Sequence, residues 1–429
     1  MFFTKTLTGL KQLGTFFYLV VVLILGNTAA WAPLAHSSEQ KAVSDTGADL
    51  EARTREQSSE EDPLTIRQQE ATETLPAVQR KEPNHAKVYG SLRVRYRGSD
   101  TQHGFSDGGS RLGIDGRYQF LPGKWIFARG EAGFNLLDEV KTLFNGGGNA
   151  EDPDGGRGDT FFRRLLYAGY ESPNLFVVFG KTWSTYYKVT SFTDRFFGTG
   201  GKAAGTYNAG TDGGYTGTGR ADNAFQTRLM VDFLPERWGL EPFQLNLQLQ
   251  DGEPIPQIDG QRYGHGLGLS ALLVTSTDFS LGIAYNHAQV RNDQDPVLRS
   301  RGLDGNATAL ALGARWFDDD WYLATVVARL QNQMTTDQGN YFDGVGWELY
   351  GQHRLGGKWW LTGGWNWLRP DGDQPLAGDY RVKFAVLGLR YALQDFDRVL
   401  YANLRDDRSL TADGSGTGNV LTIGLRWAL

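Results

Sequence analysis

Arginine occupies every second position at Arg93, Arg95 and Arg97 of this 429-residue chain. Every second side chain of an extended strand points to the same face, so this spacing gathers guanidinium groups on one surface. Comparable polar-face positions hold Arg111, Arg117, Arg129, Arg164, Arg228, Arg315, Arg329 and Arg426. Fixed charges along a wet passage select which ions pass without any covalent step. The chemistry we expect is therefore electrostatic selection of solutes.

Residues for enzymatic or metal chemistry show no comparable pattern. The six histidines are scattered, and none stands in a recognisable nucleophile motif with a serine or a carboxylate. Without cysteine, the chain forms neither disulfides nor thiolate metal sites. One acidic group could hold a divalent cation together with phosphates, as of lipopolysaccharide, or with a neighbouring subunit, but it lacks the EF-hand spacing and is better interpreted as solvated charge: Glu151, Asp152, Asp154 and Asp159. We expect no enzyme, no cofactor and no metal, and a formal charge of −6 gives no reason to expect nucleic acid.

Strands with two different faces must position the arginines. Residues 243–250 read F-Q-L-N-L-Q-L-Q, so apolar side chains share one face and amides share the other. The same period of two returns at residues 88–97, 112–120, 267–273, 310–316 and 421–429. An apolar outer face and a wet inner face are typical of a barrel in lipid.

Composition agrees with a barrel. Glycine numbers 56, aromatic residues make up 13% of the chain and tryptophan numbers 12, which suits tight strand ends and aromatic girdles at a membrane surface. After residue 30, no apolar run approaches the roughly 18 to 20 residues that a spanning helix needs. If the chain crosses a membrane there, it crosses as strands.

Short and long connections alternate along residues 85–429. Short turns are expected near residues 121–124, 171–174, 318–320, 355–358 and 394–397. Longer polar connections are expected near residues 98–109, 136–160, 182–222, 251–263, 292–304, 332–342, 370–379 and 406–418. The pattern predicts an all-β fold, a transmembrane antiparallel β-barrel of about 16 strands with both ends on the short-turn side. Between Tyr380 and Leu393 the alternation changes phase near Val386, which suggests either a bulge or a mistaken strand assignment.

The N-terminal region has a different character. Residues 1–37 have the basic, apolar and small-residue order of a secretory signal peptide, with an uncertain cleavage point; an uncleaved helical anchor is the alternative. Residues 38–84 are acidic and poor in aromatic residues, as in a disordered periplasmic tail or linker, although docking to the cell wall or a partner is another interpretation. Residues 85–429 form the expected barrel domain.

The connection at residues 182–222 is far longer than an ordinary hairpin loop. It combines many glycines with seven aromatic side chains before residue 208: Trp183, Tyr186, Tyr187, Phe192, Phe196, Phe197 and Tyr207. Such a segment can fold inward and narrow a wide barrel. An outer loop resting on a neighbouring subunit is the alternative.

Three short motifs in this region resemble the general-diffusion porins of Gram-negative outer membranes. R-R-L-L-Y-A-G-Y at residues 163–170, F-G-K at 179–181 and F-T-D-R-F-F-G-T-G-G at 192–201 are similar to that family's fourth strand, fifth strand and constriction loop, in order. The resemblance implies a trimeric sixteen-stranded barrel with its long third extracellular loop folded into the lumen. It also implies that Asp194 is the constriction carboxylate, opposed by Arg111, Arg164 and Arg228.

One departure from the family concerns charge. The family's second loop acid corresponds to Gly198, so Asp212 or Asp222 would have to compensate. Further lumen candidates are Arg93, Arg95 and Lys181. Because arginine outnumbers acids at the expected constriction, we expect weak cation selectivity at most, or a preference for anions.

The function expected from these observations is passive diffusion of small hydrophilic solutes and ions across the outer membrane, with both termini in the periplasm. The expected partners are outer-membrane lipid, lipopolysaccharide and further copies of the chain in a homotrimer. Two alternatives remain open: a channel selective for sugars or anions on the same barrel, and a structural or adhesive surface barrel that does not conduct.

Overall fold

The computed structural model describes residues 84–99, 103–135, 161–173, 175–231, 243–275, 278–393 and 398–429. The expected signal peptide, the expected tail up to residue 83 and the acidic cluster of residues 151–159 lie outside these described residues. Within them, no helix has the length and apolar character needed to span a membrane.

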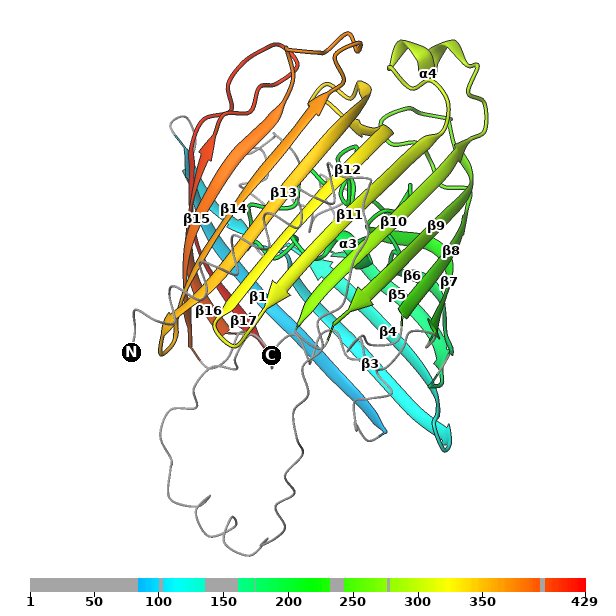
Figure 1. Cartoon of the computed structure of the whole chain (residues 1–429), viewed down its shortest axis with the longest axis vertical. Coiled ribbons are helices and arrows are strands. Elements are labelled where there is room, and N and C mark those ends of the chain that lie inside the picture. Colours follow the sequence, from blue (N-terminus) through cyan, green and yellow to red (C-terminus); the bar gives the residue numbers. More distant parts are fainter. Residues whose placement is uncertain are drawn as a thin grey trace, which may run out of the picture. The chain divides into compact units, whose positions relative to one another are not determined.

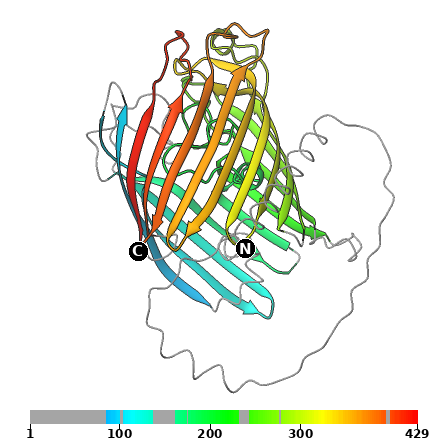
Figure 2. The same cartoon turned by 60° about the vertical axis from the view of Figure 1, so that its left-hand side comes forward.

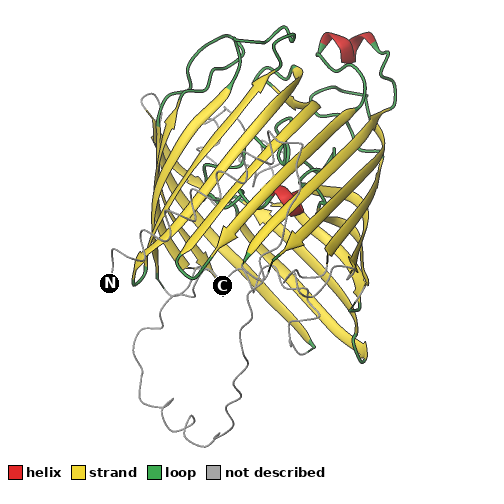
Figure 3. Cartoon of the chain, viewed as in Figure 1, coloured by secondary structure: helices red, strands yellow, loops and turns green. Residues whose placement is uncertain are grey.

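Almost every regular element in the described residues is a strand (Figure 3). Two short helices, α3 (Tyr187–Thr190) and α4 (Pro296–Ser300), lie in connections. The strands are β1 (His85–Ser99), β2 (His103–Asp107), β3 (Ser110–Leu121), β4 (Lys124–Phe134), β5 (Phe161–Glu171), β6 (Leu175–Trp183), β7 (Arg220–Val231), β8 (Phe243–Asp251), β9 (Tyr263–Val274), β10 (Phe279–Val290), β11 (Ala307–Phe317), β12 (Trp321–Thr335), β13 (Tyr341–Gly356), β14 (Trp359–Pro370), β15 (Val382–Ala392), β16 (Arg398–Asp407) and β17 (Val420–Ala428).

These segments close into one antiparallel barrel (Figures 1 and 2). Each strand pairs with its neighbours in sequence, and β1 pairs with β17 to complete the wall. β2 and β3 occupy a single wall position, because β2 pairs with the second half of β1 and β3 with the first half. The described wall therefore has 16 strand positions, and the predicted barrel of about 16 strands is confirmed.

The strand wall separates an apolar exterior from a polar interior, as β8 illustrates. Leu245 and Leu249 are exposed on the outside, whereas Asn246 and Gln248 are buried on the inside. The apolar and polar residues that alternate in the sequence of residues 243–250 therefore alternate between the outer and inner faces of the folded wall. Because each backbone polar group of a closed wall bonds to a neighbouring strand, such a wall can lie in hydrocarbon without exposed edges.

The connection between β6 and β7, residues 184–219, is here called L3. It carries α3 and runs inside the barrel (Figures 1 and 2). α3 contacts β9, β10 and β11.

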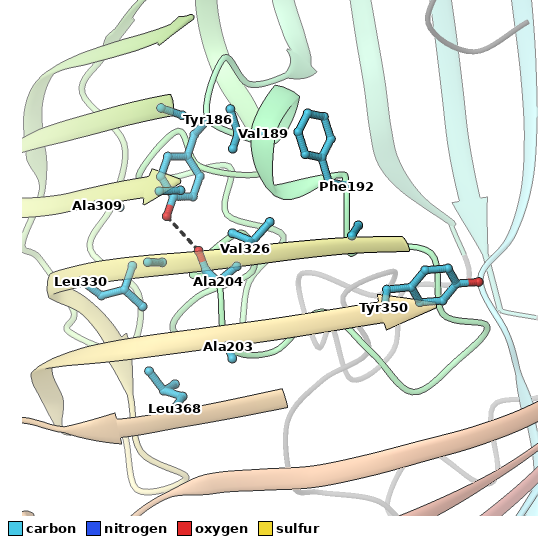
Figure 4. Close-up of a cluster of buried hydrophobic side chains, with 14 of the residues drawn as sticks. Tyr186, Val189, Phe192, Ala203, Ala204, Ala309, Val326, Leu330, Tyr350 and Leu368 are labelled. Atoms are coloured by element: carbon cyan, nitrogen blue, oxygen red, sulfur yellow. Dashed lines mark hydrogen bonds between the residues drawn. The ribbon is translucent and has the colours of Figure 1, made fainter. Parts of the chain in front are cut away.

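L3 packs against the inner surface of β9–β14, here called the apolar wall. From L3, Tyr186, Val189 and Phe192 join a buried cluster with inward-facing side chains such as Val326 and Leu330 (Figure 4). Much of this wall carries small side chains at inward positions, which leaves room for L3: Ala284, Ala309, Ala311, Ala324 and Ala328. The burial of apolar surface therefore holds the loop inside the barrel.

The expected inward position of Arg329 is wrong, and of the two alternatives for residues 380–393 the bulge is wrong; both cases concern apolar residues that face inward. Arg329 lies on the outer face of β12, where it pairs with Asp371, because the inward positions belong to the apolar wall. β15 has no bulge, and its pairing with both neighbours is continuous. The apparent phase change arises because Phe384 and Val386 face inward, with the guanidinium of Arg405 4.0 Å from the Phe384 ring centre.

Candidate functional site: the lumen constriction

A carboxylate from the wall fixes the two sides of the L3 tip. Glu348 of β13 is 1% exposed and accepts hydrogen bonds from the Thr193 hydroxyl at 2.6 Å and from the Ala203 and Ala204 amides at 2.7 and 2.8 Å. Two residues before it, Gly346 leaves room for the loop, since a Cβ there would overlap the Ala203 carbonyl oxygen. Residues 193 and 203–204 are therefore tied to one side chain, and the intervening residues project toward the opposite wall.

Ion pairs fix the base of L3. The Lys181 ammonium lies 2.9 Å from an Asp212 oxygen and 3.0 Å from an Asp222 oxygen. Asp212 also pairs with Arg220 at 3.0 Å, and Asp222 pairs with Arg163 at 3.3 Å. Burial opposes ionisation of Asp212, yet Arg220 and Lys181 keep its pKa below the ordinary value. Lys181, Asp212 and Asp222 do not line the lumen cavity, so their placement supports the loop's base.

A cavity of about 900 Å³ lies between L3 and the wall. Among the described residues that line it, 17 are Lys or Arg and three are acids, namely Asp115, Glu171 and Asp194. Arg93, Arg95, Arg111, Arg164 and Arg228 are all in this lining. The structure thus brings ten of the eleven arginines named from the sequence to one cavity, together with the loop carboxylate; the exception is Arg329.

Asp194 lies on the L3 surface that faces the cavity. Its carboxylate accepts hydrogen bonds from the Tyr187 hydroxyl at 3.0 Å and from the Tyr207 hydroxyl at 2.6 Å. Burial and the neighbouring Asp194 charge raise the pKa of Tyr207 well above its ordinary value, so this hydroxyl remains a donor. Asp194 is therefore held in place by two aromatic residues of its own loop.

The arginines of β3–β7 share carboxylates of the same wall. Arg111 and Arg164 approach Glu131 at 3.8 and 2.7 Å. Arg117 and Arg228 approach Glu171 at 3.4 and 3.3 Å. Sequence reasoning did not single out these two acids. Glu131 follows Arg129 by two residues on the same inward face of β4, so the period of two contained the signal for it.

The arginines of β1 face the L3 tip. Arg93 donates from Nε to the Ser91 hydroxyl and Arg95 from Nε to the Ser106 hydroxyl, both at 3.1 Å. Arg93 is directly opposite Arg426 in the pairing of β1 with β17. At Gly198, a Cβ would lie 3.0 Å from Nη1 of Arg95, so this guanidinium closely approaches the loop backbone at the position where the resemblance leads one to expect an acid.

The L3 tip contacts β15–β17 through carbonyl oxygens and an aromatic ring. Arg390 donates to the Arg195 carbonyl at 2.7 Å, and Asn403 donates to the Phe197 carbonyl at 2.8 Å. The guanidinium carbons of Arg390 and Arg426 lie 3.9 and 5.5 Å from the Phe197 ring centre. Carbonyl and ring contacts stabilise arginines without cancelling their charge.

Lys202 adds a base from the loop itself. Burial, followed by the charges of Arg405 and Arg97, lowers the pKa of its ammonium to about 7. Sequence reasoning missed Lys202, Arg390 and Arg405 as members of the constriction. Only the folded path of L3 brings Lys202 to the wall. Arg390 lies on β15, where inward-facing apolar residues obscure the alternation in the sequence.

Comparisons with known proteins agree with this architecture. No family model matches the chain. The chain is 28% identical over 269 residues to the outer membrane porin PhoE of Citrobacter freundii, covering 62% of this chain and 68% of that protein. The OmpF structure from Salmonella typhi, in complex with daunomycin, has a TM-score of 0.62 and 18% identity, with 81% of this chain and 98% of that one covered. The anion-selective porin from Comamonas acidovorans has a TM-score of 0.57 and 17% identity, with 81% and 100% covered.

The structural matches establish the fold, and the sequence match places that fold among porins. Porins are channels, which favours a non-enzymatic function here. The chain therefore has the fold of outer-membrane porins and is similar in sequence to one of them, the outer membrane porin PhoE, and these likenesses support passive diffusion across the outer membrane as its function.

Proposed function

We propose that this channel is narrowed by L3 and conducts anions in preference to cations. The observation that carries the proposal is the charge of the cavity lining, with 17 bases and three acids among the described residues. Asp194 stands on the loop side, and Arg111, Arg164 and Arg228 stand on the wall side. Size exclusion comes from the bulk of the loop, and charge selection comes from the surplus of bases.

Local neutralisation does not remove this surplus. Among the described ion pairs, Glu131 and Glu171 each lie beside two arginines, so these pairs contain more bases than acids. In a narrow passage little bulk water separates a solute from the wall, and charges act there more strongly than in open solution. The resulting potential attracts anions and opposes the entry of cations.

The test is the reversal potential of the purified protein in a planar bilayer, under a tenfold gradient of potassium chloride. A pore that favours anions gives a reversal potential with the same sign as the equilibrium potential of chloride. A reversal potential near that of potassium would contradict the proposed selectivity, and the absence of conductance would favour the structural or adhesive barrel.

We also propose that the protein is a homotrimer in contact with outer-membrane lipid and lipopolysaccharide. Support comes from a flat patch on the outer face, where Gly116, Ala128 and Ala168 are directly paired across β3, β4 and β5. Small side chains allow two walls to approach closely in a membrane. Light scattering of the detergent-solubilised protein tests the stoichiometry: Ala128→Trp should reduce the trimeric fraction, and a monomeric wild type would contradict the proposal.

A further inference from the structure

We propose that Gln248 of β8 is a positioning residue, whose side-chain amide joins the first residues of L3 to the last ones and so sets where the loop lies across the lumen. Gln248 is 1% exposed and does not belong to the described lining of the cavity, so it acts on solutes only through the loop. The inference rests on the L3-narrowed pore proposed above, and it adds the residue that fixes the path of the loop.

The inward face of β8 carries a column of four amide side chains, Gln244, Asn246, Gln248 and Gln250. At the start of the strand, Gln244 donates to Asn246 and Asn246 donates to Ser270, both at 3.1 Å, so these amides are used within the wall. Further along, Gln248 and Gln250 instead bind backbone groups of L3. The change of partners marks the part of the column that holds the loop.

The Gln248 amide uses both of its polar atoms on the ends of the loop. Its Oε1 atom accepts a hydrogen bond from the Thr185 amide at 3.1 Å, and its Nε2 atom donates one to the Gly217 carbonyl at 3.0 Å. Gln226 of β7 donates to the same Oε1 atom at 2.9 Å and to the Trp183 carbonyl at 3.0 Å. Because donors face the oxygen and an acceptor faces the nitrogen, one orientation of the Gln248 amide satisfies these bonds.

Two glycines bring the ends of L3 close enough for this contact. Gly268 of β9 lies directly opposite Gln248 in the strand pairing, and a Cβ there would lie 2.5 Å from the Thr185 hydroxyl oxygen. Gly217 has a φ of +85°, and a Cβ there would lie 2.6 Å from Nε2 of Gln248. A larger residue at either position would therefore push the loop away from the amide.

The start of L3 leads directly to the cavity. α3 begins at Tyr187, just after Thr185, and Tyr187 and Lys188 of this helix line the cavity. Loss of the Gln248 amide takes these bonds from the buried Thr185 N–H and Gly217 C=O groups, and buried polar groups are costly to leave unpaired. The loop start should then leave the wall for part of the time, and α3 should move with it. The expected result is a passage of variable width.

The end of L3 keeps other bonds when Gln248 is replaced. The donors are two further wall amides and the hydroxyl of the first loop residue, and the acceptors are backbone carbonyls: Gln250 to Gly214 at 2.6 Å, Asn286 to Thr216 at 2.7 Å and Ser184 to Thr218 at 2.7 Å. Substitution of Gln248 should thus loosen the base of L3 without releasing the whole loop, and the barrel should still fold.

The test replaces Gln248 by glutamate, whose charge state decides whether it can serve both ends of the loop. The neutral acid keeps an acceptor for Thr185 and has a hydroxyl donor for Gly217, whereas the carboxylate only accepts. Single-channel conductance of the full-length protein in potassium chloride is measured from about pH 4 to about pH 9, a range in which carboxyl groups of proteins, including buried ones, titrate. Each value is divided by the wild-type conductance at the same pH.

The conductance ratio of Gln248→Glu should be close to one at the acidic end of this range. It should rise by roughly 1.5-fold toward the alkaline end, with a noisier open current, because the released loop start widens the passage. In Gln248→Met, which has a similar volume but no amide, the ratio should be raised at every pH. A role in folding alone would not make the ratio of channels that have already folded follow pH.

Asn246→Asp is the matched control for the added charge. Asn246 lies on the same face of the same strand, and its hydrogen bonds run to Gln244 and Ser270 rather than to L3. Its conductance ratio should vary by less than about 1.2-fold over the same pH range. A conducting channel from each variant shows that the barrel has folded.

The proposal is overturned if Gln248→Met has the conductance and noise of the wild type, if the ratio of Gln248→Glu does not change with pH, or if Asn246→Asp changes as much as Gln248→Glu. Failure of the L3-narrowed pore itself would appear as an unchanged conductance after deletion of residues 192–201. The two failures can therefore be distinguished.

Discussion

The two inner walls of this barrel are built from strands of the same kind but face different surroundings. The apolar wall of β9–β14 presents mainly small and apolar side chains to L3. The remaining wall, on β1, β3–β7 and β15–β17 and here called the basic wall, presents most of the cavity's arginines to the lumen. The difference teaches that an inward position is not polar by default: its character follows from whether a loop or water lies against it.

The two walls also divide the work of the pore. The apolar wall fixes L3 through buried side chains and through Glu348, which is buried at the centre of three hydrogen bonds. The basic wall keeps a surplus of positive charge, which does not help the barrel to fold, because like charges repel. We infer that the first wall sets the width of the passage and the second its charge preference.

Removal of the loop tip should change the pore most. Deletion of residues 192–201 takes away the segment between the two walls and should raise single-channel conductance by roughly twofold or more, because the narrowest part widens. Conductance in potassium chloride is the measurement. An unchanged value would mean that the tip does not limit the passage.

Loss of the Glu348 carboxylate should have the next largest effect. Glu348→Ala removes three hydrogen bonds to a charged acceptor, each of which contributes about 1.5 to 3 kcal/mol. L3 should then detach from the apolar wall for part of the time, which would give noisy currents with a higher mean conductance.

Glu348→Gln is the matched control for that prediction. Its amide oxygen can still accept from the Ala203 and Ala204 amides, so its currents should be close to those of the wild type. If Glu348→Ala conducts as quietly as Glu348→Gln, the carboxylate does not hold the loop.

A single charge on the loop should have a smaller effect. Asp194→Asn removes one of the three acids in the cavity lining and should increase the anion-to-cation permeability ratio by about twofold. Reversal potentials before and after the substitution measure the change. A shift toward cations would contradict the position of Asp194 beside the conduction path.

The dependence on pH should be the smallest effect, because few bases titrate near neutrality. Lys202, with a pKa of about 7, and Lys188, whose pKa burial and Arg228 lower to about 8, are charged below these values and neutral above them. The anion-to-cation permeability ratio should therefore fall as pH rises from 6 to 9. In Lys202→Met, the part of this fall that occurs at the lower pH values should disappear. A permeability ratio that rises with pH would contradict the assignment of the fall to these two lysines.

The sequence allowed prediction of the wall but only part of the constriction. The period of two along a strand is visible in the chain itself, so the strand number and the outward leucines of β8 could be predicted. The outward placement of Arg329 could not be predicted, because its strand faces L3 and has apolar residues on both sides.

Contacts between distant segments account for the residues that were missed. Glu348 meets Thr193 across 155 positions of the sequence, and Arg390 meets Arg195 across 195. No local pattern encodes such pairs; they depend on the path of L3. The roles of Asp212 and Asp222 depend in the same way on Lys181 and Arg220, which the folded loop brings to them.

The most direct test of the arrangement of L3 between two walls uses the absence of native cysteine. Ser191 lies on L3 and lines the cavity, whereas Leu404 of β16 is exposed on the outer face. A negatively charged, membrane-impermeant thiol reagent is applied to open single channels of Ser191→Cys and Leu404→Cys. The account predicts a stepwise fall in current for Ser191→Cys and none for Leu404→Cys; an unaltered current after verified labelling of Ser191→Cys would contradict it.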